Sequence, residues 1–273
     1  MTTPTRPTQE PARPARRVSP RPLAAATAAV LGLAVPLVPA MVLAPAAFAS
    51  ETGEGGEAGE AGVVRQSGTA GFLADLGLFE AAHRIVGTLY QRGEYAEALE
   101  QLQDSHHAFY DDIEPALTAL GAPGFAAEAE AFAQAIADEV TTEIAAARLS
   151  ALLAAIDAAR DASQATLGDR LLSMKSLLDV AAADYAGGVE NGVVTLDHEY
   201  RDAWGFVETV RARAQHLAQS ADPATAQAGT EVLDQLAPLA PLFPDLTATQ
   251  TSGDPDLIAV AAAWVEIIAL RHR

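Results

Sequence analysis

The sequence predicts an all-α protein, a bundle of about seven or eight helices arranged as antiparallel hairpins. After residue 68, apolar residues recur at helical spacing through most of the chain, which favours amphipathic helices. Short loops rich in glycine and proline separate the helical segments, and short loops place successive helices antiparallel. No alternating run of strand length is present, because the best candidate, Val193-Val194, has only two residues.

The first helices are predicted from the spacing of their apolar residues. In the segment 71–92, Leu73, Leu76 and Phe79 lie on one face of a helix, and Gly93 ends it. A short third helix ends at Gly121. In all, the expected helices are 71–92, 94–107, 113–120, 125–140, 143–163, 167–185, 196–220, 223–236 and 255–271.

The later helix ends are predicted from capping and breaking residues. Gly187-Gly188 is expected to stop the helix before it, and Thr195 to cap the helix after it. Asp254-Pro255 is typical of a cap followed by a first turn. The helical domain should span residues 69–273, and a division into two halves near 141–165 is compatible with this pattern.

Residues 1–49 have the three parts of a signal peptide. The first 21 residues carry five arginines, residues 22–49 carry no charge, and the stretch ends in Ala47-Phe48-Ala49. An uncleaved membrane anchor is the alternative, although Pro36 and Pro39 would interrupt a spanning helix. We therefore expect a cleaved export signal, a periplasmic or secreted protein, and no membrane insertion after cleavage. A flexible Gly/Glu linker, residues 50–68, should follow.

The composition restricts the chemistry of the protein. The chain has no cysteine, so disulfides, thiolate metal sites and haem attached through Cys-x-x-Cys-His are excluded. Five of the 17 basic and one of the 36 acidic side chains lie in residues 1–49, which leaves a net charge near −23 for the rest. Such a chain repels nucleic acid and attracts cations. No nucleophile elbow, phosphate loop or dinucleotide motif is present, so we expect neither an enzyme nor an organic cofactor.

One candidate metal site lies in the first half of the chain. Three of the six histidines, His83, His106 and His107, fall within 25 residues. Counting outward from a turn at residue 93, His83 lies ten residues before it and His107 fourteen after it, so both could approach across the hairpin. His107 and Asp111 share a helix face. We predict His83, His107 and Asp111 as ligands; ordinary surface or core histidines are the alternative.

A second candidate site lies around the glycine-rich loop of the second half. Glu190 lies in this loop, and His198 and Glu199 lie in the first turn of the following helix. His198 and Asp202 are four residues apart and share a face. We predict Glu190, His198 and Glu199 as ligands of a cation. The alternative is an ordinary helix start, where acids are favoured by the helix dipole.

The same segment carries a family resemblance. It reads Asp184-Tyr185, Gly187, Val189-Glu190-Asn191-Gly192-Val193-Val194, Glu199-Tyr200 and Phe206-Val207. Over about residues 177–211 it resembles the extracytoplasmic helical extension of long-form bacterial high-affinity iron permeases, with Asn191 where an acid is usual. The membrane helices and Arg-x-x-Glu motifs of the permease are absent from the sequence. The resemblance therefore implies a stand-alone protein that works beside a metal transporter.

We interpret the sequence as a periplasmic metal-binding accessory protein linked to uptake of iron or another transition metal. The bound metal would be an iron or copper ion, and the partner an inner-membrane metal permease or another periplasmic carrier. The alternative rests on the pattern Gly87, Tyr90 and Gly93-Glu94-Tyr95, which resembles one tetratricopeptide helix pair. On that interpretation the protein is a helical scaffold for protein–protein interaction without metal.

Overall fold

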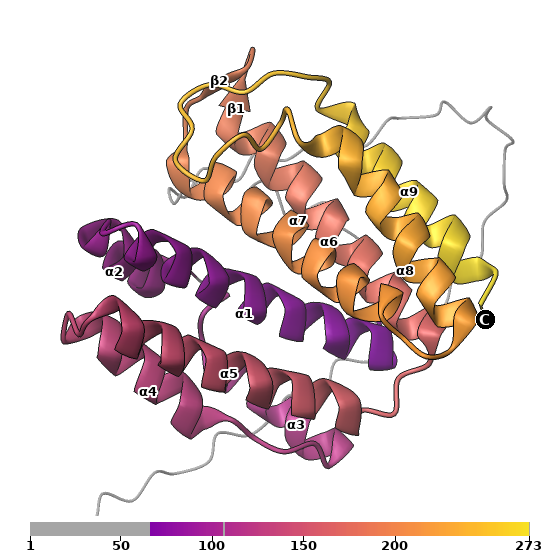
Figure 1. Ribbon diagram of the computed structural model, residues 1–273, viewed down its shortest axis with the longest axis horizontal. Helices are drawn as coiled ribbons and strands as arrows, with labels where there is room; N and C mark the ends of the chain where they lie inside the picture. Colours follow the sequence, from indigo (N-terminus) through magenta and orange to yellow (C-terminus); the bar gives the residue numbers. More distant parts are fainter. Residues whose placement is uncertain (1–65, 106, 273) are drawn as a thin grey trace, which may run out of the picture. The chain divides into compact units, whose positions relative to one another are not determined.

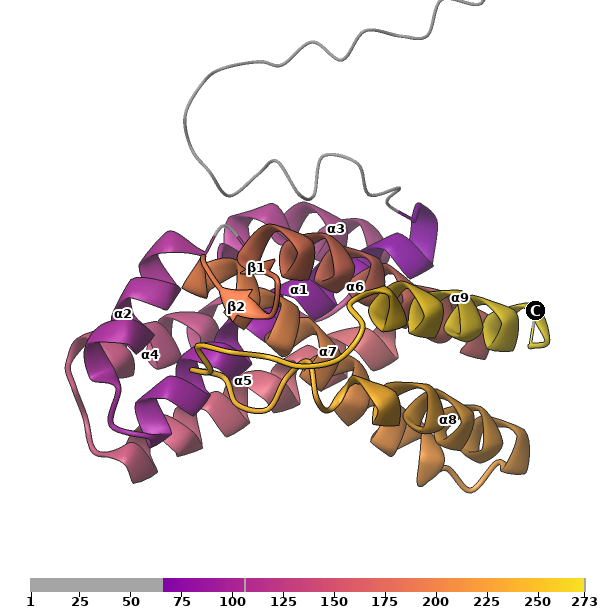
Figure 2. The same cartoon turned by 90° about the horizontal axis from the view of Figure 1, so that it is seen from above.

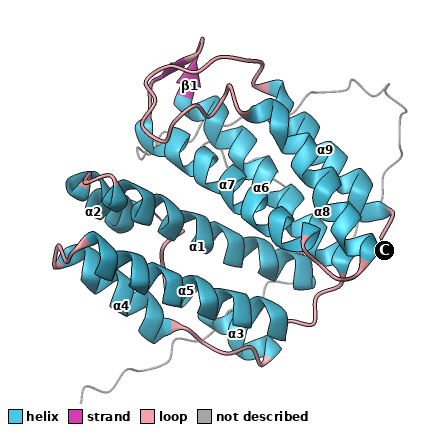
Figure 3. Ribbon diagram, viewed as in Figure 1, coloured by secondary structure: helices cyan, strands magenta, loops and turns pink. Residues whose placement is uncertain are grey.

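The computed structural model describes residues 66–105 and 107–272. The predicted signal peptide, nearly all of the predicted linker, and His106 lie outside the described residues. The described chain is predominantly helical (Figure 3), so the predicted all-α class is confirmed. Its nine α-helices are α1 (Gly68–Gln91), α2 (Tyr95–Asp104), α3 (Glu114–Leu120), α4 (Ala126–Ala137), α5 (Thr142–Ala162), α6 (Leu167–Gly188), α7 (Asp197–Ala218), α8 (Pro223–Leu236) and α9 (Asp256–Leu270). Two short 3-10 helices, Tyr110–Asp112 and Ala237–Leu239, lie between them.

The last four helices form an antiparallel bundle. Helix α6 packs against α7 and α9, and α8 packs against α7 and α9, so the four close into a ring (Figure 1). Their shared core, which we call the C-terminal core, includes Leu177, Tyr200, Phe206 and Val265. All four of these side chains are at most 3% exposed. Two starts are capped by side chains: Thr166 and Asp169 form a capping box on α6, and Asp222 accepts from the Thr225 amide on α8.

Helices α1 to α5 build a second core around the other side of α1. This N-terminal core includes Phe79, Leu89, Phe125 and Phe132. Helix α1 packs on α2 and α5 and also on α6 and α7 (Figure 1). Eighteen of its 24 residues are buried, as expected for a helix that packs against neighbours on more than one face. Helix α1 is therefore the element that both cores share.

Glycines allow two of the helix pairs to approach closely. A Cβ atom on Gly205 of α7 would lie 2.5 Å from Cδ1 of Ile85 on α1. A Cβ atom on Gly229 of α8 would lie 2.4 Å from the backbone nitrogen of Ala218 on α7. Both positions leave no room for a larger residue.

The connection from α6 to α7 differs from the prediction. Helix α6 ends at Gly188, at the predicted Gly187-Gly188 stop and three residues beyond the expected last residue, 185. Val193–Val194 does form a strand (β2), antiparallel to Val189–Glu190 (β1), so the expectation of no strand there was wrong. Asn191 and Gly192 make the turn with φ of 52° and 78°, as in the two-residue hairpin turns that suit strand twist.

The predicted role of Thr195 was also wrong. Leu196 precedes the first turn of α7, and it is Leu196, not Thr195, that occupies the cap position. The Thr195 hydroxyl instead donates to the carbonyl of Gly188, at 3.3 Å. The threonine therefore closes the hairpin onto the end of α6 rather than capping α7.

The proline-rich crossover from α8 to α9 runs back along the β1–β2 hairpin (Figures 1 and 2). The Val194 amide donates to the Thr249 carbonyl, and the Thr251 amide donates to the Gly192 carbonyl. Arg92 forms a bidentate salt bridge with Asp245, in which Nη1 and Nη2 donate to Oδ1 and Oδ2 at 2.7 and 2.9 Å. The crossover thus connects the α6–α7 junction to the turn between α1 and α2.

Within residues 66–105 and 107–272, no helix combines the length and the hydropathy needed to cross a membrane.

Candidate functional site

His83 lies in the N-terminal core. Its side chain is 2% exposed, and its ring centroid lies 4.1 Å from that of Phe79 and 5.8 Å from that of Phe132. The Nδ1 atom is 2.8 Å from the Phe79 carbonyl one turn earlier. Burial lowers the pKa of His83 from 6.5 to about 4, so the imidazole is neutral at physiological pH.

The burial of His83 predicts a pH-dependent stability. Because its folded pKa lies below its unfolded value, the unfolded chain takes up the proton first, and stability is lost as the pH falls from about 6.5 towards 4. One pKa unit corresponds to about 1.4 kcal/mol, so the loss at the low end is on the order of 2–3 kcal/mol. Urea titrations at several pH values give the free energy of unfolding of wild type and of His83→Leu. This additional loss of stability between pH 6.5 and 4 should be seen only in wild type. Equal losses in the two proteins would contradict the assignment.

The other two predicted ligands of the first half lie in different surroundings. His107 is half-buried, with its ring edge-on to Phe206 of α7 at a centroid distance of 5.5 Å. Asp111 is exposed in the 3-10 helix Tyr110–Asp112. Across the described ranges, no group of three or more histidine and acidic side chains stands ready to hold a metal ion.

Of the second predicted set, only Glu199 is buried. Glu190 is exposed on β1, and the His198 side chain is 55% exposed. Glu199 is 6% exposed, with its Oε1 atom 3.7 Å from His198 Nε2. Of these three predicted ligands, one is therefore a buried acid at the α6–α7 junction, and the other two lie on the surface there.

Two further acids of α6 and α7 are buried within about one turn of the contact between Gly188 and Glu199. Asp184 of α6 is 3% exposed and Asp202 of α7 is 8% exposed. An added Cβ on Gly188 would lie 2.9 Å from the Cβ of Glu199, so the end of α6 touches the start of α7. Asp184 lies one turn before Gly188 on α6, and Asp202 lies about one turn after Glu199 on the antiparallel α7. We call Asp184, Glu199 and Asp202 the buried carboxylate cluster.

The surroundings of this cluster are polar on one side and aromatic on the other. Gln101 of α2, itself 5% exposed, donates from Nε2 to the Asp202 carboxylate at 2.8 Å. Tyr185 and Tyr200, the residues next to Asp184 and Glu199 in sequence, point into the C-terminal core and hydrogen-bond the crossover at Thr251 and Asp245. The hairpin, the crossover and α2 thus hold both helix ends in place around the acids.

The sequence contained a partial signal for Asp184 and Asp202. Asp202 follows Glu199 by three residues and Asp184 precedes Gly188 by four, so each shares a helix face with a residue at the junction. What the sequence did not show is the burial of these two acids, which depends on the packing of α2 and the crossover against α7.

The fold and this cluster define a helical bundle with buried acids where two antiparallel helices meet. Comparison with protein families relates this part of the chain to a known class. Residues 161–269 match the family model of the iron permease-associated 4-helix bundle domain, and this range contains α6, α7, α8 and nearly all of α9. The resemblance to the iron permease extension is thereby confirmed for this segment, which is similar to a bundle associated with iron permeases. Neither a search of curated proteins nor a search of solved structures gave a match.

Proposed function

We propose that the protein is an exported accessory protein of iron or other transition-metal uptake. It binds a metal cation as cargo and passes it to an inner-membrane permease or to another periplasmic carrier, and it is a binding protein rather than an enzyme. The observation that carries this proposal is the buried carboxylate cluster within the segment similar to the iron permease-associated bundle.

The chemistry of the cluster favours a hard cation. Asp184, Glu199 and Asp202 supply carboxylate oxygens, hard ligands that suit manganese and that also hold iron in carboxylate-lined helical bundles. Because no ready three-residue site is present in the described ranges, binding requires the acids to rotate toward the ion. Burial between α6 and α7 would strengthen their attraction for it, since the local dielectric is low. The net charge of −19 raises the concentration of cations around the chain.

The proposal is tested by titrating the protein with Fe(II) under anaerobic conditions, and with Mn(II), Zn(II) and Cu(II), by calorimetry. We expect Fe(II) to bind with a Kd in the micromolar range, and Glu199→Gln with Asp202→Asn to raise that Kd by about 100-fold or more, equivalent to about 2.7 kcal/mol. Both substitutions preserve side-chain size.

Matched controls separate the cluster from general acidity. Glu208→Gln removes a carboxylate from the same helix at a position paired with Arg211, and should leave the affinity unchanged. Glu190→Gln with His198→Gln tests the exposed residues of the predicted set, and a change of no more than about twofold is expected. Binding weaker than millimolar in wild type, or a double variant that binds as wild type does, would refute the proposal.

An interaction scaffold without metal is the second candidate, and the exposed face of α9 favours it. Val260, Trp264 and Ile267 are 45–48% exposed and lie on one side of this helix. A scaffold would bind its partner equally well with the carboxylates neutralised, and Trp264→Ala would weaken that binding. The metal titration therefore distinguishes the two functions.

A further inference from the structure

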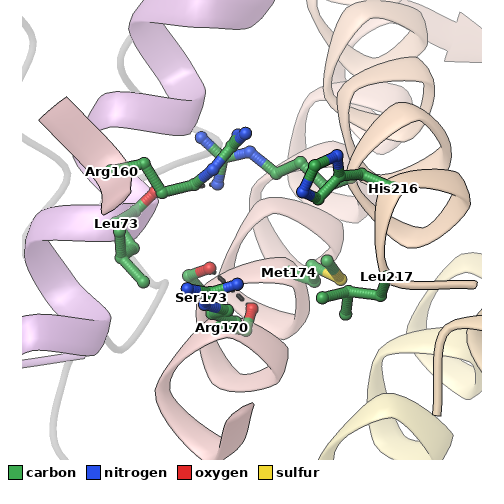
Figure 4. Close-up of a pocket in the computed structure, with 8 residues that line it drawn as sticks. Leu73, Arg160, Arg170, Ser173, Met174, His216 and Leu217 are labelled. Carbon is green, nitrogen blue, oxygen red and sulfur yellow. Dashed lines mark hydrogen bonds between the residues drawn. The ribbon is translucent and has the colours of Figure 1, made fainter. Parts of the chain in front are cut away.

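A pocket lined by both basic and apolar side chains lies where α5, α6 and α7 meet α1. Its charged and polar residues, which we call the basic pocket, are Arg160, Arg170, Ser173, Arg213 and His216. The pocket is small, with about 20 Å³ open to the centre of a water-sized sphere, and it is partly open to solvent. In Figure 4, Arg160 and His216 lie at the upper left and upper right of the pocket, and Arg170 and Ser173 lie below them.

The floor of the pocket is a buried charge network around a single carboxylate. Glu80 of α1 is 1% exposed, and its Oε2 atom accepts from Arg213 Nε at 3.1 Å. Its Oε1 atom accepts from Arg84 at 2.7 and 2.9 Å, and Arg160 lies 3.7 Å from Oε2. Burial raises the pKa of Glu80, but these three guanidinium groups together lower it below 4.5. One negative charge therefore faces three positive charges.

The two aspartates that pair with Arg160 and Arg170 reduce this excess but do not cancel it. Arg160 also pairs with Asp157, and Arg170 lies 3.9 Å from Asp161. These two aspartates have side chains that are 51% and 66% exposed, so water screens them strongly. Even when both are counted, four guanidiniums stand against three carboxylates, in a chain whose overall charge is −19.

Two buried donor nitrogens at the pocket lack a hydrogen-bond acceptor in the described part of the chain. Nη2 of Arg213 lies 3.1 Å from Glu80 Oε2 but is not directed at it, and Nε of Arg170 has no acceptor at all. Arg213 is 5% exposed, and its other terminal nitrogen donates to the Leu73 carbonyl at 2.9 Å. Buried donors without an acceptor are uncommon and often mark a place for an ion or a water.

We propose that the basic pocket binds a small tetrahedral oxyanion of the phosphate class. Arg213 lies at its base, while Arg170 and His216 line the more open side. Guanidinium groups hold such anions with paired, charge-assisted hydrogen bonds. The ligand is either a free anion or the phosphate group of a small monoester. This site is separate from the carboxylate cluster, so each can be present without the other.

The proposal is tested by titrating the full chain with inorganic phosphate, sulfate and glycerol 3-phosphate at constant low ionic strength. Phosphate is expected to bind with a Kd below about 1 mM and to raise the melting temperature relative to chloride. Arg170→Gln removes a charge and His216→Gln removes an imidazole at the open side, and neither touches the Glu80 network. Arg170→Gln should weaken phosphate binding by about tenfold. Glycerol 3-phosphate that binds as tightly as phosphate assigns a monoester, and weaker binding assigns the free anion.

Arg211→Gln is the matched control, because Arg211 is a guanidinium on the same helix that pairs with Glu208 outside the pocket. It should bind phosphate as wild type does. Circular dichroism and thermal unfolding without phosphate check that each variant is folded. The proposal is overturned if phosphate and sulfate give no binding in wild type, or if folded Arg170→Gln with His216→Gln retains the wild-type affinity.

Discussion

Glu80→Gln is expected to lower the free energy of unfolding by about 3–5 kcal/mol, because it leaves buried guanidinium groups without their counter-charge. Arg213 is as deeply buried as Glu80, and it cannot reach water without opening the contact between α1 and α7. Breaking such a pair costs more than its mutual attraction, since the remaining charge stays in a medium of low dielectric.

Urea denaturation at neutral pH measures this loss, and Glu208→Gln is its control. Glu208 also pairs with an arginine, Arg211, but both side chains are about one-third exposed, so a loss below about 1 kcal/mol is expected. The folded pKa of Glu80 is lowered, so its contribution is complete above about pH 4.5 and disappears as the pH falls through the folded pKa. A Glu80→Gln protein as stable as Glu208→Gln would show that the network contributes little.

Gly229→Ala is expected to destabilise the protein by about 3 kcal/mol, at the upper end of the range for overpacked cores. The new methyl group would meet the backbone nitrogen of Ala218 at 2.4 Å and the carbonyl oxygen of Ala214 at 2.6 Å. Backbone atoms cannot rotate aside as a flexible side chain does, so α8 would have to move away from α7 and leave gaps in the C-terminal core.

Gly187→Ala is the matched control, since it places the same methyl group in another helix of the same bundle. Its nearest neighbour would be Oε2 of Glu199 at 3.5 Å, an ordinary contact. Because alanine favours the helix over glycine, stability should stay level or rise by about 0.5–1 kcal/mol. Melting temperatures of the two variants test this, and a Gly229→Ala protein as stable as wild type would show that α7 and α8 are not so close.

The helices could be predicted to within a few residues because their periodicity and breakers are local signals. Gly93 lies in the turn after the first helix with φ of 82°, a backbone conformation that glycine adopts more easily than other residues. The β1–β2 hairpin was missed because two-residue strands have no periodicity. Its one local signal was Asn191-Gly192, the dipeptide that favours a tight hairpin turn.

The candidate sites could be predicted only in part, because burial depends on contacts between distant segments. His83 and Glu199 have the same kind of local sequence, an ionisable residue in a helix, yet His83 lies among phenylalanines and Glu199 lies against the end of α6. Glu80 gave no signal, because its partner Arg213 is 133 residues away. Whether the cluster at Glu199 holds metal stays a prediction.

The position of α1 has a consequence for cooperativity. Leu78 and Ala81 belong to the C-terminal core, whereas Phe79 and Ile85 belong to the N-terminal core. Neither core can be complete while α1 is unfolded, so the two halves should melt in one transition rather than in succession. The range 161–269 excludes α1, and a fragment of that length would leave the α6 and α7 surface around Leu177 and Gly205 open to water. In this protein the four-helix bundle depends on a fifth helix from outside it.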